Sequence, residues 1–223
     1  MGQPDRFLRL LTRNLKIVAD ILNFVLYGGE DRIQPEDLVL LPESQTFVDS
    51  NDELRELRRD SMILWRNGNM IFCFIGLESQ TYIDPDMPLR GFAYDGESYK
   101  EQILKDPNGR RYPVITFVLY YGDKPWTKNL TLRERLNIPN EFAVVVDPYF
   151  NDYHVNVIDV PRLTLEDAKK LRSVLAFMAS VYRMFEQHIE DAPLPPCRTL
   201  KNVFRRAIPE NVFPNGGYEL DLV

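Results

Sequence analysis

The chain has 223 residues, 44% of them hydrophobic, and its formal net charge is −6. This length buries a sizeable core in one or two domains, and the acidic balance argues against a large non-specific nucleic-acid surface. No apolar stretch approaches the ~20 residues that cross a bilayer, and the N-terminus lacks the order of a signal peptide, so we expect no membrane segment. The two cysteines, Cys73 and Cys197, have no metal-ligand spacing, which favours a reduced, cytoplasmic protein.

The first half of the chain is expected to begin with a helix and to continue into strands. Apolar residues spaced by three and four predict an amphipathic helix over 7–27, ended by Gly28. Asp20 on this helix is expected to be a capping or solvated acid. Residues 38–48 predict a strand that Pro42 interrupts.

The second half is expected to alternate helices and strands. Helices are predicted at 84–104, 131–136 and 165–188, and strands at 114–121, 142–146 and 155–160. Thr164 would cap the last helix, with Asp167 as the third residue of a capping-box variant. Because the Pro-rich stretch 192–196 predicts a stiff linker, we expect a domain at 1–190 and a C-terminal extension at 191–223. The pattern favours a mixed α/β fold.

Two carboxylates and an amide stand at the ends of two apolar runs in the middle of the chain. Asp60 opens the run 60–65, and Glu78 and Gln80 follow the run 70–77. Because side chains alternate along a strand, Glu78 and Gln80 share a face. Mg²⁺ binds oxygen ligands of this kind and often takes only one or two carboxylates. Acids and amides at strand ends are also common without function, but the long buried strand before this pair favours a cation site.

The register of the hairpin that joins these runs tests the cation site. With a strict two-residue turn, Asp60 would pair with Ile75 and point away from Glu78. A three-residue turn or a bulge sets Asp60 opposite Gly76, on the face of Glu78. We therefore predict an odd loop or a bulge in this hairpin.

A longer set of residues follows the order and spacing of one known family. The matching residues are Phe47-Val48-Asp49, Glu53-Leu54-Arg55, Asp60, Trp65, Glu78-Ser79-Gln80, Met87-Pro88-Leu89-Arg90, Tyr94, Pro113-Val114-Ile115, Tyr120-Tyr121-Gly122 and Pro125-Trp126. The chain thereby resembles, over roughly residues 7–185, the recombination-promoting nucleases. These are also called YhgA-like transposases, and they are a branch of the PD-(D/E)XK nucleases. Tyr121 departs from the pattern, since the family has His there.

The resemblance implies a restriction-endonuclease-like αβββαβ core, with a mixed central sheet flanked by helices. It implies a metal-dependent DNA endonuclease, linked to recombination or mobile elements, in which Asp60 and Glu78 hold Mg²⁺ and Mn²⁺ substitutes for it. Such a metal polarises the phosphate and lowers the pKa of bound water. Gln80 stands where most of the superfamily has Lys, although this family commonly has Gln. Because an amide takes up no proton, Gln80 would orient water or contact the phosphate.

Basic residues near Asp60 are candidate contacts for DNA phosphates. Arg58, Arg59 and Arg66 surround it in the sequence, and Arg90 matches a family motif. A solvated arginine face is the alternative explanation for such a cluster. A homodimer would supply the two active centres that cleavage of both strands needs.

Two other functions stay open at this point. The first is a catalytically inactive nuclease-fold protein that binds DNA or a protein partner, which Gln80 and the acidic net charge favour. The second is a scaffold that uses its aromatic strands as an interface, although core packing already explains the aromatic content.

Overall fold

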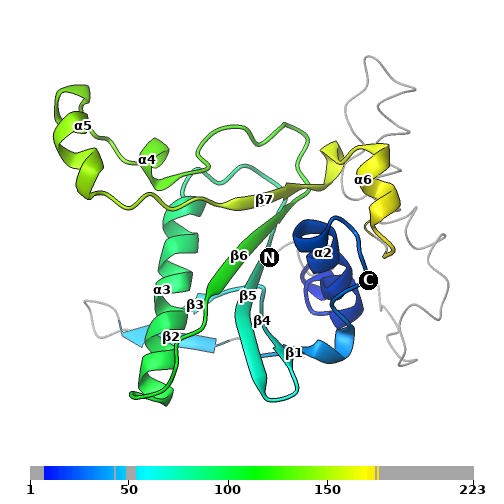
Figure 1. The fold of residues 1–223 in the computed structure, drawn as a ribbon. Helices are drawn as coiled ribbons and strands as arrows, with labels where there is room; N and C mark the ends of the chain where they lie inside the picture. The colour runs from blue at the N-terminus through cyan, green and yellow to red at the C-terminus, as the bar shows by residue number, and fades with distance from the viewer. Residues whose placement is uncertain (1–7, 43, 49–53, 174, 176–223) are drawn as a thin grey trace, which may run out of the picture.

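A mixed sheet of five strands organises the fold (Figure 1). This computed structural model describes residues 8–42, 44–48, 54–173 and 175, with only the backbone at 44–48 and 54–58. In order across the sheet, the strands are β1 (Leu38–Leu40), β4 (Ser61–Asn67), β5 (Met70–Gln80), β6 (Val114–Tyr120) and β7 (Asn156–Asp159). The pairs β1–β4 and β4–β5 are antiparallel, whereas β5, β6 and β7 are parallel. The predicted mixed α/β fold is confirmed.

Helices cover both faces of this sheet. α2 (Leu15–Tyr27) packs on one face, and α3 (Met87–Lys105) lies on the other (Figure 1). α3 also connects β5 to β6, because parallel neighbours need a crossover rather than a tight turn. The order α2, β1, β4, β5, α3, β6 reproduces the expected αβββαβ core.

The remaining elements are short. β2 (Ser44–Val48) and β3 (Leu54–Arg58) form a separate antiparallel pair between β1 and β4 in the chain. The others are η1 (Pro35–Asp37), α4 (Leu132–Arg135), α5 (Asn140–Val146), η2 (Asp147–Tyr149), η3 (Val160–Arg162) and α6 (Leu165–Lys170). Among the described helices, none combines the length and the apolar character that crossing a membrane requires.

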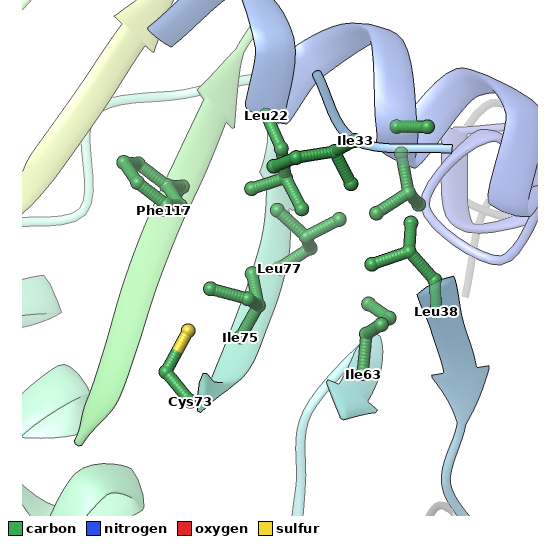
Figure 2. Close-up of a cluster of buried hydrophobic side chains, with 10 residues drawn as sticks. Leu22, Ile33, Leu38, Ile63, Cys73, Ile75, Leu77 and Phe117 are labelled. Carbon is green, nitrogen blue, oxygen red and sulfur yellow. The ribbon is translucent and has the colours of Figure 1, made fainter. Parts of the chain in front are cut away.

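The α2 face of the sheet carries an apolar core (Figure 2). Cys73, Ile75 and Leu77 are alternate residues of β5 that point into it, as the strand period of two requires. They pack with buried residues of the neighbouring elements, including Val18, Leu22, Ile33, Leu38, Ile63 and Phe117.

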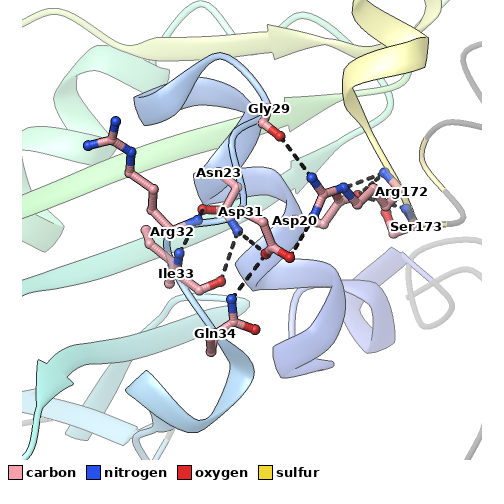
Figure 3. A network of polar contacts seen from close by, with 9 residues as sticks. All are labelled: Asp20, Asn23, Gly29, Asp31, Arg32, Ile33, Gln34, Arg172 and Ser173. Atoms are coloured by element: carbon pink, nitrogen blue, oxygen red, sulfur yellow. Dashed lines mark hydrogen bonds and ion pairs between the residues drawn. The ribbon is translucent and has the colours of Figure 1, made fainter.

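Buried polar side chains of α2 fasten two segments to the core (Figure 3). Asn23 accepts hydrogen bonds from the backbone amides of Arg32 and Ile33, at 3.0 and 2.8 Å, and donates one to the Ile33 carbonyl at 2.8 Å. The Asp20 carboxylate accepts the backbone amide of Arg172 at 2.9 Å and that of Ser173 at 2.8 Å. The expected capping or solvated acid was therefore wrong, because Asp20 is buried in the middle of α2 and binds a segment about 150 residues further along the chain.

The single helix predicted at 7–27 is wrong in its first part. Residues 8–11 are helical, residues 12–14 are not, and α2 begins at Leu15. The Thr12 hydroxyl donates to the Arg9 carbonyl at 2.9 Å, and the Asn14 side chain caps α2 by accepting the Lys16 amide at 3.1 Å. Short polar side chains compete with helical backbone hydrogen bonds in this way. The apolar residues keep their spacing of three and four across this break, and the sequence pattern therefore predicted one helix instead of two.

The strand predicted at 142–146 is also wrong, because this segment forms α5. β-branched residues favour strands through packing on a pleated, half-buried surface. This segment projects away from the sheet (Figure 1), and Val144 is 83% exposed. Without a neighbouring strand its backbone bonds locally, in a helix that starts after Pro139.

The long helix predicted at 165–188 is interrupted at 171–173, and Leu175 is helical again. The capping box of Thr164 and Asp167 forms as predicted, but α6 ends at Lys170, and Leu171 is extended. The amides that would continue the helix bind Asp20 instead. The rest of the predicted helix beyond residue 175, the linker at 192–196 and the extension at 191–223 lie outside the described residues.

Candidate active site

The β4–β5 hairpin contains the predicted irregularity. Asn67 pairs with Met70, so the turn consists of residues 68–69. The register of the two strands then shifts between Trp65 and Arg66, which marks a β-bulge. This bulge confirms the prediction of a bulge or an odd loop. Beyond it Ser61 pairs with Leu77, the last pair of this ladder, and Asp60, which directly precedes β4, lies beside the end of β5, where it accepts the Ser79 amide.

The expected partner of Asp60, Gly76, was wrong, because Gly76 pairs with Met62. The observed register differs from the expected one by two residues, and a shift of two leaves the face of each strand residue unchanged. Asp60 itself directly precedes β4, and its charge acts on Glu78.

Glu78 is the most deeply buried acid of the site, with 2% of its surface exposed. It lies on the α3 face of β5, beside the buried Val118 of β6. Burial, and secondarily the charge of Asp60, raises the pKa of Glu78 to about 8, although the Arg90 and Arg59 charges oppose this shift. Its Oε1 atom is buried and finds no hydrogen-bond partner among the described residues. A buried carboxylate oxygen without a partner is costly, and a bound cation would supply one.

Asp60 is held by two contacts that the sequence did not indicate. Its Oδ1 atom forms an ion pair with Arg9 Nε at 3.0 Å, and its Oδ2 atom accepts the backbone amide of Ser79 at 2.8 Å. The second contact ties Asp60 to the residue that follows Glu78. Arg9 lies in the helical stretch 8–11, and no local pattern relates it to a residue 51 positions further on.

Arg90 joins the site from α3. Its Nη2 atom lies 3.6 Å from Glu78 Oε2, and its Nη1 atom binds Asp84 Oδ2 at 2.6 Å. Nη2 also donates to the Tyr94 hydroxyl at 3.2 Å, and these partners raise the pKa of the guanidinium despite its partial burial. Burial, followed by the Glu78 charge, raises the pKa of Tyr94 as well. Asp84 was missed as a site residue, although an acid just before a helix that presents Arg90 one turn later is a local signal.

Gln80 lies on the same face of β5 as Glu78 and is buried. Its Nε2 atom is 4.0 Å from the sulfur of Met87, which is a weak acceptor. The amide therefore shares the face of Glu78, and among the described residues this weak contact is the one given for its side chain.

The structure separates the four arginines expected to contact phosphate. Arg90 stands at the site. Arg66 is exposed near the hairpin turn, and six strand residues of about 3.3 Å each put it about 20 Å from Asp60. Arg58 is in β3, where only the backbone is described. Arg59 is 6% exposed and paired with Asp95, so it belongs to the interior rather than to a phosphate-binding surface.

The donor set fits a hard divalent cation. Asp60, just before β4, and Glu78, on β5, contribute carboxylates, Glu78 Oε1 has no partner in the described structure, and the Gln80 amide carbonyl is a third oxygen. No cluster of three or more His, Cys, Asp or Glu side chains suited to a metal occurs within the described ranges. Mg²⁺ does not need one, since it keeps several waters and takes one or two carboxylates.

Comparison with known proteins gives one match. The family described as "Putative transposase, YhgA-like" matches residues 3–203. Searches of curated proteins and of solved structures give no match. The matched range includes the whole described fold and every residue of the site, in agreement with the resemblance seen in the sequence. The chain therefore belongs to the YhgA-like family of transposase-related proteins.

Proposed function

We propose that this protein is a divalent-cation-dependent endodeoxyribonuclease. The observation that carries the proposal is the contact of Asp60 with the Ser79 amide, which holds this carboxylate beside Glu78, where a buried oxygen has no partner among the described residues. Membership of a transposase-related family supports DNA as the substrate and a role with mobile elements. Two copies of the chain would provide one active centre for each DNA strand.

Each residue of the site has a role in this proposal. Asp60 and Glu78 hold Mg²⁺, for which Mn²⁺ substitutes. The bound cation polarises the phosphate and makes a water molecule more acidic. Gln80, which has amide donors and an acceptor but no proton to exchange, orients water or a phosphate oxygen. Arg90 contacts the phosphate through its planar guanidinium.

One observation favours a second function, binding without cleavage. Both carboxylates already have an arginine partner, Arg9 for Asp60 and Arg90 for Glu78. Arginine can balance the charge of a carboxylate without any cation. In this alternative the site is a closed ion-pair cluster, and the protein binds DNA or a protein partner through its surface.

Cleavage of supercoiled plasmid DNA separates the two functions. Wild-type protein is expected to nick or linearise the plasmid with Mg²⁺ or Mn²⁺ but not with EDTA. Asp60→Ala and Glu78→Gln should each lower the rate by about 100-fold or more, the scale of losing one electrostatic stabiliser of a transition state. Glu97→Gln is a matched control, because Glu97 is a partly exposed α3 acid whose ion-pair partner is Lys100.

Two outcomes of this experiment would contradict the proposed nuclease activity. Equal nicking by wild type and Asp60→Ala would attribute the activity to a contaminant. DNA binding without cation-dependent nicking would support the non-cleaving alternative.

A further inference from the structure

Arg59 directly precedes Asp60, and it is buried behind the candidate site. Its Nη2 atom forms an ion pair with Asp95 Oδ1 at 2.6 Å, and 6% of its surface is exposed. A buried ion pair costs desolvation that mutual attraction only partly recovers. The Nε atom adds to the cost, since it is buried without a hydrogen-bond partner in the part of the chain that the structure describes. The stability of the fold therefore does not by itself account for burying Arg59 with Asp95.

Asp95, on α3, has partners from three other parts of the chain. Besides Arg59 it accepts the hydroxyl of Thr116 on β6 at 2.6 Å and the hydroxyl of Tyr153, just before β7, at 2.8 Å. The carboxylate thus connects α3 to the segment before β4, to β6 and to the segment leading into β7. Removing Arg59 would leave the Asp95 charge buried without its opposite charge, which is costly in a low-dielectric interior.

The guanidinium of Arg59 occupies a space that β5 leaves open at Gly76. A Cβ atom at Gly76 would collide with Arg59 Nη1 and come within 2.8 Å of Thr116 Oγ1. Gly76 precedes Glu78 by two residues and therefore shares its face. On the other side, the Arg59 guanidinium carbon lies 5.1 Å from the centre of the Tyr94 ring, a cation–π contact. Arg59 is therefore enclosed between the strand that carries Glu78 and the helix that carries Arg90.

We infer that Arg59 is a positioning residue of the cation site, whose buried contacts with Asp95 and Gly76 fix the adjacent Asp60 against the strand that carries Glu78. The inference rests on the proposed function, because it assumes that Asp60 and Glu78 bind the cation. Arg59 itself touches neither cation nor DNA. An error of about 1 Å in the separation of two ligands is enough to weaken a site of this kind.

The test measures Mn²⁺ binding to the full chain by electron paramagnetic resonance, which requires no DNA and no turnover. Arg59→Met keeps the aliphatic stem and removes the guanidinium. It is expected to raise the Mn²⁺ dissociation constant about 10-fold or more, and to lower kcat for plasmid cleavage while changing KM by less than about twofold. Arg59→Lys, which restores a charge near Asp95, is expected to recover part of the Mn²⁺ affinity.

Two glycine variants keep the test decisive if Arg59→Met does not fold. Gly76→Ala leaves every charge in place but displaces the guanidinium, so it should weaken Mn²⁺ binding. Gly96→Ala adds the same methyl group on α3, where a Cβ meets nothing within 4 Å, and should bind Mn²⁺ as wild type does.

Each outcome has a distinct meaning. Folded Arg59→Met or Gly76→Ala protein with wild-type Mn²⁺ affinity overturns the positioning role and leaves the nuclease proposal intact. Wild-type protein whose Mn²⁺ affinity equals that of Asp60→Ala overturns both. Loss of affinity in Arg59→Met and Gly76→Ala, with Gly96→Ala unchanged, supports the inference.

Discussion

The two faces of β5 differ in almost every physical respect. On the α2 face, Cys73, Ile75 and Leu77 join a core built from apolar side chains. On the α3 face, Gly76 makes room for a buried guanidinium, Glu78 is a buried acid, and Gln80 a buried amide. Consecutive residues of β5 thus lie in different environments, because side chains alternate between the two faces of a strand.

The two faces also differ in how much they contribute to the stability of the fold. Apolar burial stabilises the fold by about 25 cal/mol for each Å², and the α2 face contributes in this way. The α3 face buries the Arg59–Asp95 ion pair and a Glu78 carboxyl whose pKa is raised to about 8. Buried charges of this kind add little stability. The contrast therefore separates an apolar face of β5 from a polar one that carries the residues of the candidate site.

The largest effect on stability is expected from the apolar face. Ile75→Ala removes a side chain that is fully buried in the α2-face core. It should lower the free energy of unfolding by about 2–5 kcal/mol, through lost transfer free energy and the cavity left behind. Urea denaturation measures the change, and Val144→Ala on exposed α5 is the control, expected within about 0.5 kcal/mol of wild type. A loss below 1 kcal/mol for Ile75→Ala would show that this face is not the main source of stability.

A gain in stability is expected instead when Glu78, the residue after Leu77, is replaced by an uncharged amide. Between pH 4.5 and about 8 the unfolded Glu78 loses its proton while the folded one keeps it, so the cation-free protein becomes less stable as pH rises through this window. Glu78→Gln removes this dependence. Since one pKa unit corresponds to about 1.4 kcal/mol, the variant should be more stable than wild type by a few kcal/mol at pH 9 and nearly equal at pH 4.5. Thermal unfolding in EDTA across this range measures it, and parallel curves for the two proteins would contradict it.

A smaller loss is expected where the α3 face is made more apolar. Thr116→Val is nearly isosteric and removes the hydroxyl that donates to Asp95 at 2.6 Å. It should destabilise the protein by about 1–3 kcal/mol, the range for a hydrogen bond to a charged group. Urea denaturation at pH 7 tests this, with the slope expected to stay unchanged. A stabilised Thr116→Val protein would mean that the polar network costs more than it returns.

The smallest effect concerns the chemistry of Cys73, on the apolar face. Burial raises the pKa of this thiol to about 11, so about one molecule in a thousand carries the reactive thiolate at pH 8. In a Cys197→Ser background, native Cys73 should react with iodoacetamide at least about 100-fold more slowly than the same protein in urea. Unfolding of the Cys197→Ser protein beside wild type checks the stability of this background. Similar labelling rates with and without urea would show that this face is open to solvent.

Local patterns predicted much of the site. The pair Glu78 and Gln80 follows a long apolar run, and the period of two placed both on one face. The demand that Asp60 share this face predicted an irregular hairpin, and the bulge between Trp65 and Arg66 confirms it. The sequence could not predict the exact register. A shift of two residues leaves each side chain on the same face of the sheet but gives it a different partner on the next strand.

Other features failed because they depend on distant residues. The segment 142–146 has strand-like side chains, yet it forms α5 because no strand lies beside it. The helix after Thr164 ends at Lys170 because the next amides bind Asp20, a residue of the first helix. Arg59 resembled a surface arginine in the sequence, and its partner Asp95 is 36 positions away.

The sequence by itself determined the helices and strands of the αβββαβ core, the two faces of β5 and the residues that end it, since these follow from periods of two and of 3.6 within short windows. The tertiary structure alone decided which charges are buried and what they contact. Arg9 with Asp60, Arg59 with Asp95 and Arg90 with Glu78 are pairs that only the packing of the N-terminal helix and α3 around the sheet brings together. Ion pairs depend on the distance between charges in space, and a local sequence pattern does not report that distance.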